Sequence, residues 1–429
     1  MAATVSRPLN PLRLHGANFR VQDLPTEVRH RAVVLVADDD APSRAVLYWR
    51  EGVTPRVGIH LMHPRTDQSQ NYNIVALAQA GYAVLGRAGR WVNNDVDTVH
   101  ETLMLDMAAG VRFLRDEVGC EQVVLVGNSG GGTLASMYQW QARTDPPGRL
   151  TRTAAGDPLD LNAVDLPPAD GIAIIAGHRG EGEVLLKYID PSVVDESDPV
   201  AADPELDMYH PANGFRTPPE SSHYPDDFLE RYRRAQRERV RRIDVLARSL
   251  VAQQKAGGTA ADILERDSPE AAMRLRRLAV GAVHMVIYRT AADPAATDLG
   301  IEPDDRVVGS YLSKRPDLEN YGGPGFARYI TPRGWLSTWS GLSSRANTIA
   351  CLQQIHDPLL FVHYAGDEGL RMSEAEAIVK GSAATDKELV VVRHADHYGR
   401  VINPDGSIGT QTTEGTRAIV DWITARFKN

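Results

Sequence analysis

The sequence predicts an α/β fold: a doubly wound, mostly parallel sheet with an inserted, mainly helical segment. Short runs of apolar, β-branched residues alternate with stretches of helical periodicity over residues 31–177, and the alternation returns over 351–429. Such alternation is typical of a parallel sheet with helices on both faces. Residues 178–350 contain no comparable strand run. We therefore expect a core in two parts, 31–177 and 351–429, interrupted by a helical cap at 178–350.

The first part of the predicted core follows an irregular N-terminal arm, residues 1–30. Its apolar runs predict strands at 31–36, 44–49, 57–62, 82–85, 123–126 and 171–176. Between them, apolar residues at helical spacing predict helices at 73–80, 97–115 and 133–140. Each predicted helix lies between two strands, as the crossover connections of a parallel sheet require.

Sequence patterns also predict the helices and strands of the cap and of the second part of the core. A long helix is expected to begin near Asp226, because Pro225 suits a first helical turn and acidic residues suit the positive end of a helix. Further helices are predicted at 268–288, 374–380 and 416–427, and strands at 358–364 and 388–392. An insertion at the carboxyl edge of such a sheet falls where ligands bind, so we expect it to cover a site.

One short stretch organises the predicted site. The strand 123–126 runs into Gly127-Asn128-Ser129-Gly130-Gly131, and a helix follows. Strand, sharp turn with a serine at its tip, and helix are the context of a nucleophile elbow. The strained turn needs small residues two positions before and after the serine, and glycine stands at both. A phosphate-binding loop would need a lysine after the glycines, and none follows.

A serine hydroxyl is a weak nucleophile unless a base takes its proton and an acid orients that base. On this scaffold the expected chain order is serine, acid, histidine. Asp367 directly follows the predicted strand 358–364, which makes it the candidate acid, and the adjacent Glu368 is the alternative carboxylate.

The loop after the last predicted strand offers two candidate bases, His394 and His397. His394 adjoins the end of the strand, whereas His397 lies deeper in the loop and can reach back to Ser129. We therefore favour His397. For the other histidines, such as His100, a structural or surface role is expected.

A tetrahedral oxyanion needs at least two hydrogen-bond donors. The N–H of Gly130, which follows the candidate nucleophile, is the first. The second should come from the loop after the third strand, His63-Pro64-Arg65-Thr66. Because proline has no N–H, Arg65 is the candidate and Thr66 the next choice. An ordinary strand-ending His-Pro turn is the alternative interpretation of this loop.

Composition excludes several classes of function. The 429 residues carry a net charge of −9, with 47 basic and 56 acidic side chains, and such an acidic protein is a poor candidate for nucleic-acid binding. The two distant cysteines suggest a reducing compartment. No apolar run has the length of a membrane span, and the N-terminus lacks a signal-peptide pattern, so we expect a cytoplasmic protein. Without a metal-binding or dinucleotide motif, no metal and no cofactor are expected.

The elbow, Asp367 within Ala-Gly-Asp and His397 within Ala-Asp-His together resemble the α/β-hydrolase superfamily. The resemblance covers residues 31–177 and 355–429. It implies an eight-stranded sheet, a Ser129–His397–Asp367 triad and an acyl-enzyme on Ser129, with no cofactor. The sequence departs from the His-Gly oxyanion motif of many lipases, and the cap matches no particular subfamily. A serine at the elbow also differs from haloalkane dehalogenases, which carry aspartate there.

The sequence therefore predicts a serine hydrolase that cleaves a carboxylic ester of small-molecule size. Cap aromatics suggest an apolar or aromatic substrate, although packing within the cap explains them equally well; they are Tyr311, Tyr321, Phe326, Tyr329, Trp335 and Trp339. Cleavage of a carbon–carbon bond in a β-diketone, a lactone or an amide is the alternative on the same scaffold. A non-catalytic binding protein is the remote alternative function. The sequence is also compatible with a homodimer.

Overall fold

The computed structural model describes residues 24–91, 96–311, 313–323 and 325–428. Most of the predicted arm, residues 1–30, lies outside these ranges. Strand β1 (Val28–Val36) begins three residues before the predicted start at Arg31. It does so because Val28 is still paired with Arg50 at the far end of β2 (Pro42–Arg50).

Eight strands form one sheet in the order β1-β2-β4-β3-β5-β6-β9-β10. β1 and β2 are antiparallel, β2 is antiparallel to β4, and all other neighbours are parallel. The strands not yet given bounds are β3 (Val57–Leu61), β4 (Ala83–Arg87), β5 (Gln122–Asn128), β6 (Gly171–Ile175), β9 (Leu359–Tyr364) and β10 (Lys387–Val392). This arrangement confirms the predicted doubly wound, mostly parallel sheet.

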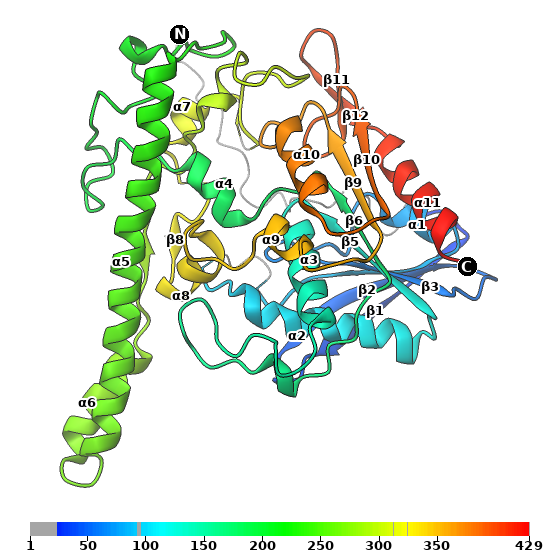
Figure 1. Ribbon diagram of the computed structural model, residues 1–429, viewed down its shortest axis with the longest axis horizontal. Coiled ribbons are helices and arrows are strands. Elements are labelled where there is room, and N and C mark those ends of the chain that lie inside the picture. Colours follow the sequence, from blue (N-terminus) through cyan, green and yellow to red (C-terminus); the bar gives the residue numbers. More distant parts are fainter. Residues whose placement is uncertain (1–23, 92–95, 312, 324, 429) are drawn as a thin grey trace.

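Helices cover both faces of the sheet (Figure 1). Helices α1 (Ile74–Gln79) and α11 (Glu414–Arg426) pack on one face, and α2 (His100–Arg112), α3 (Gly130–Arg143), α9 (Thr348–Leu352) and α10 (Met372–Gly381) pack on the other. Successive residues of β5 serve the two faces in turn: Val124 packs with the first group and Leu125 with the second. Both are fully buried, as expected for a strand covered on both faces.

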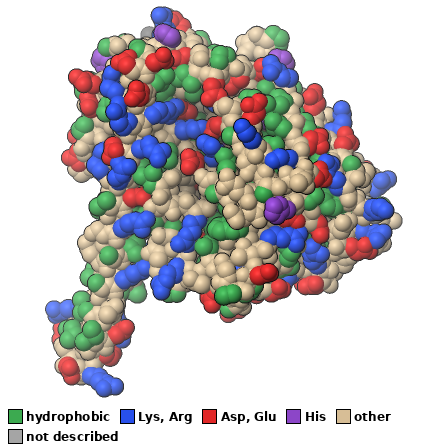
Figure 2. All heavy atoms as spheres, in the orientation of Figure 1, with side chains coloured by type: hydrophobic (Ala, Val, Ile, Leu, Met, Phe, Trp, Pro, Cys, Tyr) green, Lys and Arg blue, Asp and Glu red, His purple; other side chains and the backbone are tan. Residues whose placement is uncertain are grey.

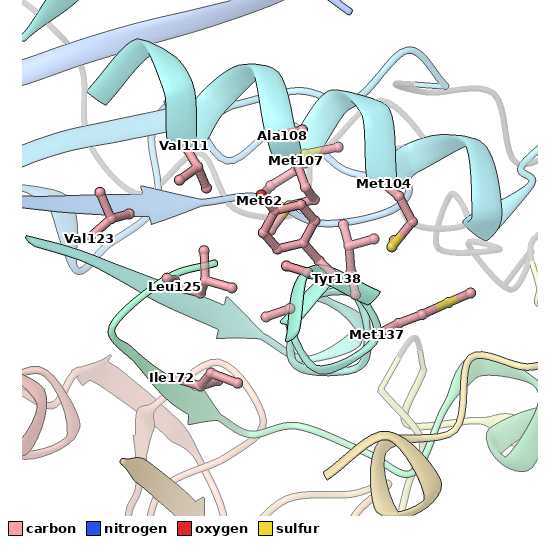
Figure 3. Close-up of a cluster of buried hydrophobic side chains, with 14 of the residues drawn as sticks. Met62, Met104, Met107, Ala108, Val111, Val123, Leu125, Met137, Tyr138 and Ile172 are labelled. Carbon is pink, nitrogen blue, oxygen red and sulfur yellow. The ribbon is translucent and has the colours of Figure 1, made fainter. Parts of the chain in front are cut away.

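The face that carries α2 and α3 holds the helix of the elbow in place (Figure 3). Met104 and Met107 of α2 and Tyr138 of α3 meet Leu125 of the sheet in a single buried cluster. All four side chains are at most 2% exposed. Because well-packed interiors resist displacement, this cluster holds α3 against β5.

The segment between β6 and β9 is the predicted cap. It contains α4 (Glu181–Tyr188), α5 (Asp226–Leu264), α6 (Pro269–Val280), α7 (Pro316–Glu319) and α8 (Pro332–Gly334), with two short strands, β7 (Met285–Val286) and β8 (Tyr329–Ile330). In Figure 1, α5 runs along one side of the molecule and α6 folds back on its end. The predicted helix 268–288 is therefore too long: it ends at Val280, before Gly281.

This segment has hydrophobic clusters of its own. Residues of α4 and α5 pack with Trp335 and Trp339, and Tyr224, Phe228 and Tyr232 form a second cluster. The boundaries at 178 and 350 remain predictions, and α9 spans the second of them. Figure 2 shows side chains of both charges spread over the visible face of the molecule. Ile263, near the end of α5, and Val280, the last residue of α6, are exposed.

After β10 the chain forms a small two-stranded sheet that the sequence did not predict, β11 (Arg400–Ile402) with β12 (Ile408–Gln411). A bridge between Ala395 and Val401 closes the loop that contains His397. None of the helices in the described ranges is both long and apolar enough to span a membrane.

Candidate active site

Ser129 lies at the tip of the turn between β5 and α3. Its backbone is held at φ 55° and ψ −125°, a region that residues with a side chain rarely adopt. The Ser129 N–H donates to the carbonyl of Ile175 in the neighbouring strand β6, at 2.9 Å. The residue is half-buried, so its hydroxyl can still be reached.

The two glycines expected to make room for this turn do so by different contacts. A Cβ at Gly127 would overlap the backbone of Gly131 and Gly132, and a Cβ at Gly131 would lie 2.6 Å from the carbonyl oxygen of Met62. Neither space can hold even a methyl group. The glycine spacing of the motif is thus explained by close packing of backbone on backbone.

The structure brings Ser129, His397 and Asp367 together in one line. His397 Nε2 lies 3.1 Å from Ser129 Oγ, and His397 Nδ1 lies 2.7 Å from Asp367 Oδ2. The other oxygen of Asp367 accepts hydrogen bonds from the N–H groups of Gly369 at 2.8 Å and Leu370 at 3.1 Å. The carboxylate is therefore fixed by the backbone on one side and presented to the imidazole on the other.

Burial and charge oppose each other at this pair. Burial alone would raise the pKa of Asp367, but His397 and its hydrogen bond hold that pKa below the ordinary value. Burial alone would lower the pKa of His397, but the negative charge of Asp367 and the hydrogen bond between them raise it above the ordinary value. Near neutral pH, Asp367 is therefore an anion that orients the imidazole.

The alternative acid and base lie elsewhere. His394 has a side chain that is 68% exposed and lies 3.5 Å from Asp305, away from Ser129. Glu368 is buried, and its carboxylate accepts from the backbone N–H of His397 at 3.4 Å instead of facing the ring. Burial, with the neighbouring Asp396 and Asp367, raises the pKa of Glu368 to about 7.

The two predicted oxyanion donors differ in their surroundings. Gly130 is the first residue of α3, where the backbone N–H groups of a helix have no intrahelical acceptor. The N–H groups of Arg65 and Thr66 both donate to Nδ1 of His63, each at 3.1 Å. Because these amides point at the imidazole, the geometry does not support the prediction that Arg65 N–H is the second donor.

A buried polar cluster beside Gly130 was not found from the sequence. Glu181 of α4 is 1% exposed, and its Oε2 lies 3.3 Å from Nε2 of His100. Burial opposes its ionisation, but the adjacent imidazoles, above all that of His100, hold the pKa of Glu181 below the ordinary value. Burial also lowers the pKa of His178, next to this carboxylate, to about 4. Single residues on separate elements have no spacing that a sequence pattern could reveal.

Aromatic side chains from the predicted cap form a series of ring contacts that begins at His397. The ring centre of Tyr311 lies 4.3 Å from that of His397 and 6.3 Å from that of Phe326. Phe326 in turn lies 5.6 Å from Trp339, over which the guanidinium of Arg65 sits at 4.8 Å. We call Tyr311, Phe326 and Trp339 the aromatic wall. Of the other predicted aromatics, Trp335 is buried, whereas Tyr321 and Tyr329 are exposed.

Within the described ranges, no group of three or more His, Cys, Asp or Glu side chains is arranged to hold a metal ion. The two cysteines, Cys120 and Cys351, are both buried and unpaired.

Comparisons with known proteins give likenesses of shape only. No protein-family model matches the sequence, and no curated protein matches it. Solved structures that resemble the chain include DcsB in complex with its substrate analogue (12% identity, 94% of this chain and 100% of the other, TM-score 0.49). Est1E from Butyrivibrio proteoclasticus is 10% identical and has a TM-score of 0.46, with 93% of this chain and 99% of the other covered. The Paleococcus ferrophilus monoacylglycerol lipase is 14% identical and has a TM-score of 0.38, with the same two coverages.

The fold itself follows from the strand order and the elbow. Eight strands with the second antiparallel, a positive-φ serine between β5 and α3, and an acid and a histidine after the last two strands define an α/β-hydrolase fold.

Proposed function

We propose that the protein is a serine hydrolase that cleaves a carboxylic ester through an acyl-enzyme on Ser129. The observation that carries the proposal is the line of contacts from Ser129 Oγ to His397 Nε2 at 3.1 Å and from His397 Nδ1 to Asp367 Oδ2 at 2.7 Å. A hydroxyl, a base and an orienting carboxylate in hydrogen-bond reach are what nucleophilic acyl transfer needs.

In the proposed reaction, Ser129 Oγ attacks the ester carbonyl carbon as His397 Nε2 takes the hydroxyl proton. The tetrahedral intermediate collapses, the C–O bond to the alcohol breaks, and His397 returns the proton to the departing oxygen. Water then attacks the acyl carbon, gives its proton to His397, and the acid leaves as Ser129 regains its hydrogen. Asp367 holds the imidazole and stabilises its charge throughout. The N–H of Gly130 is one donor to the oxyanion.

We also propose that the substrate carries an apolar or aromatic group next to its ester. This rests on the aromatic wall, which begins 4.3 Å from the His397 ring and continues away from it. The segment 178–350, which supplies these side chains, would then act as a cap over the site. A small-molecule substrate fits this arrangement, and no cofactor enters the proposed reaction.

The test is hydrolysis of short p-nitrophenyl esters by wild type and Ser129→Ala, with intact-mass detection of a fluorophosphonate adduct. We expect turnover to fall by on the order of 10⁶ in the variant and the adduct to disappear. Ser249→Ala, which changes an exposed serine on α5, is the control and should keep both. Activity that survives Ser129→Ala, with no adduct on wild type, would contradict the proposal and favour a binding protein. A panel of lactones, amides and β-diketones then identifies the bond that is cleaved.

A further inference from the structure

The ring of His63 occupies a defined position at the end of β3. Its Nδ1 accepts hydrogen bonds from two backbone N–H groups, those of Arg65 and Thr66, each at 3.1 Å. A ring nitrogen that accepts hydrogen bonds carries a lone pair, so the proton of the neutral ring must sit on the other nitrogen, Nε2. The loop backbone thereby fixes the tautomer of His63 with its N–H donor at Nε2.

The charge state agrees with this tautomer. Burial, together with the guanidinium of Arg65, lowers the pKa of His63 well below the ordinary value, so the ring is neutral near pH 7. The carboxylate of Glu181 lies on the Nε2 side of the ring, because a Cβ built on Gly130 would contact both Glu181 Oε1 and His63 Nε2. A negative charge there favours a proton on Nε2 over one on Nδ1.

The contacts of Gly130 limit how far Nε2 can lie from the proposed first oxyanion donor, Gly130 N–H. A Cβ built on Gly130 would be 3.0 Å from His63 Nε2. Covalent geometry puts a residue's own nitrogen about 2.5 Å from its Cβ, so Gly130 N and His63 Nε2 are at most about 5.5 Å apart. Two donors that each lie 2.7–3.1 Å from one oxyanion can be at most about 6 Å apart. Among the described residues, Nε2 of His63 has no hydrogen-bond partner.

We infer that the Nε2–H of His63 is the second oxyanion donor, in place of the Arg65 amide that the sequence suggested. The role rests on the proposed function, because an oxyanion forms only if Ser129 attacks a carbonyl. The side chain of His63 would then donate the hydrogen bond that the sequence analysis assigned to the backbone N–H of Arg65. The amides of Arg65 and Thr66 would act through the ring, by holding it in the donating tautomer.

Two amide substitutions separate donation from support of the loop. In His63→Asn the side-chain oxygen stands near the place of Nδ1, so it can still accept from Arg65 and Thr66, but nothing replaces Nε2–H. In His63→Gln the side-chain nitrogen reaches the place of Nε2, but nothing replaces the acceptor at Nδ1. Donation therefore predicts that His63→Gln is more active than His63→Asn, whereas a purely structural role predicts the reverse order.

The experiment measures kcat, KM and thermal unfolding of both variants, and the inhibition constant of a trifluoromethyl ketone. This inhibitor adds to Ser129 Oγ and forms an oxyanion without a leaving group. For His63→Asn we expect kcat to fall by on the order of 10²–10³ and inhibition to weaken by a similar factor. Its KM and unfolding temperature should stay close to those of wild type.

The outcomes distinguish this inference from the proposed function. If wild type gives no fluorophosphonate adduct and no ester turnover, the proposed function fails. If wild type is active and His63→Asn keeps its kcat and its affinity for the ketone, the inference alone is wrong. Loss of activity with a matching loss of unfolding temperature, and His63→Asn more active than His63→Gln, would assign His63 a structural role only.

Discussion

Asp367 Oδ2 lies 2.7 Å from His397 Nδ1, and neither side chain is more than 7% exposed. An ionised carboxylate only accepts hydrogen bonds, so Nδ1 must carry the proton and Nε2 must present its lone pair to Ser129. The relationship between these two residues therefore decides whether His397 can act as a base. Five predictions follow from this contact and from the structure around it, beyond the tests of Ser129 and His63.

Asp367→Asn should keep the fold and lose the reaction. The amide oxygen can still accept from Gly369 and Leu370, but its NH₂ would face Nδ1 and turn the imidazole to the wrong tautomer. We expect kcat to fall by on the order of 10⁴ with little change in KM. Steady-state kinetics with a p-nitrophenyl ester and thermal unfolding measure the two effects. Asp386→Asn, at a surface pair with Arg426, is the control and should behave as wild type.

The reaction should be lost as the pH falls. His397 must be neutral to take the proton of Ser129, and Asp367 raises its pKa above the ordinary value despite the burial of the ring. A base with a raised pKa becomes protonated at a higher pH than a free histidine. We therefore expect the midpoint of the acid limb of kcat/KM to lie above about 6.5. A profile that stays flat to pH 5 would show that His397 is not the base.

Glu368→Gln should move that midpoint to lower pH. The carboxylate of Glu368, itself with a pKa of about 7, is one of the negative groups that raise the pKa of His397. Its removal leaves the imidazolium less stabilised, so His397 loses its proton at a lower pH. Glu376→Gln, on the exposed side of α10, is the matched control. An unchanged midpoint in Glu368→Gln would show that Glu368 does not influence His397.

The sequence was informative where a candidate site residue lies in the turn that follows a strand. Ser129, Asp367 and His397 lie in turns after β5, β9 and β10, and the apolar runs of these strands are local signals. Parallel strands end at one edge of a sheet, so residues in those turns meet there. The fold class, the line of three side chains and the glycine spacing could therefore be read before the structure was known.

Other features depend on contacts that no local pattern records. Glu181 and His100 come from α4 and α2 and meet only because both helices pack near the start of α3. The position of His63 was noted only as part of a turn, since the sequence cannot show that two amides bind its ring. Short strands such as β11 and β12 are too brief for periodicity to be read.

Gly127→Ala should destabilise the protein as well as inactivate it. Its Cβ would overlap the backbone of Gly131 and Gly132, and backbone atoms cannot move aside as the end of a flexible side chain can. We expect a loss of about 1–3 kcal/mol or more in the free energy of unfolding. Gly323→Ala has no atom within 4 Å of the new Cβ and is the matched control. Chemical denaturation compares the two, and equal stability would contradict the role given to Gly127.

Phe326→Ala should change which esters are hydrolysed. Phe326 is the middle member of the aromatic wall, 6.3 Å from Tyr311 and 5.6 Å from Trp339. If the wall binds the substrate, the variant should lose affinity for phenyl-bearing esters and keep its rate on acetyl esters. An aromatic contact contributes about 0.5–1.5 kcal/mol beyond burial, so the ratio of the two kcat/KM values should fall by a factor of about 2 to 12.

The ratio of the two kcat/KM values is the useful measurement because both esters are hydrolysed by the same folded molecules. Partial unfolding of the variant lowers both values by the same factor and leaves their ratio unchanged. Tyr329→Ala, at an aromatic residue of the same segment that is 51% exposed, is the control and should leave the ratio unchanged. A ratio that is unchanged in Phe326→Ala as well would mean that the wall packs the segment without contacting the substrate. The preference for aromatic esters would then have to come from another part of the site.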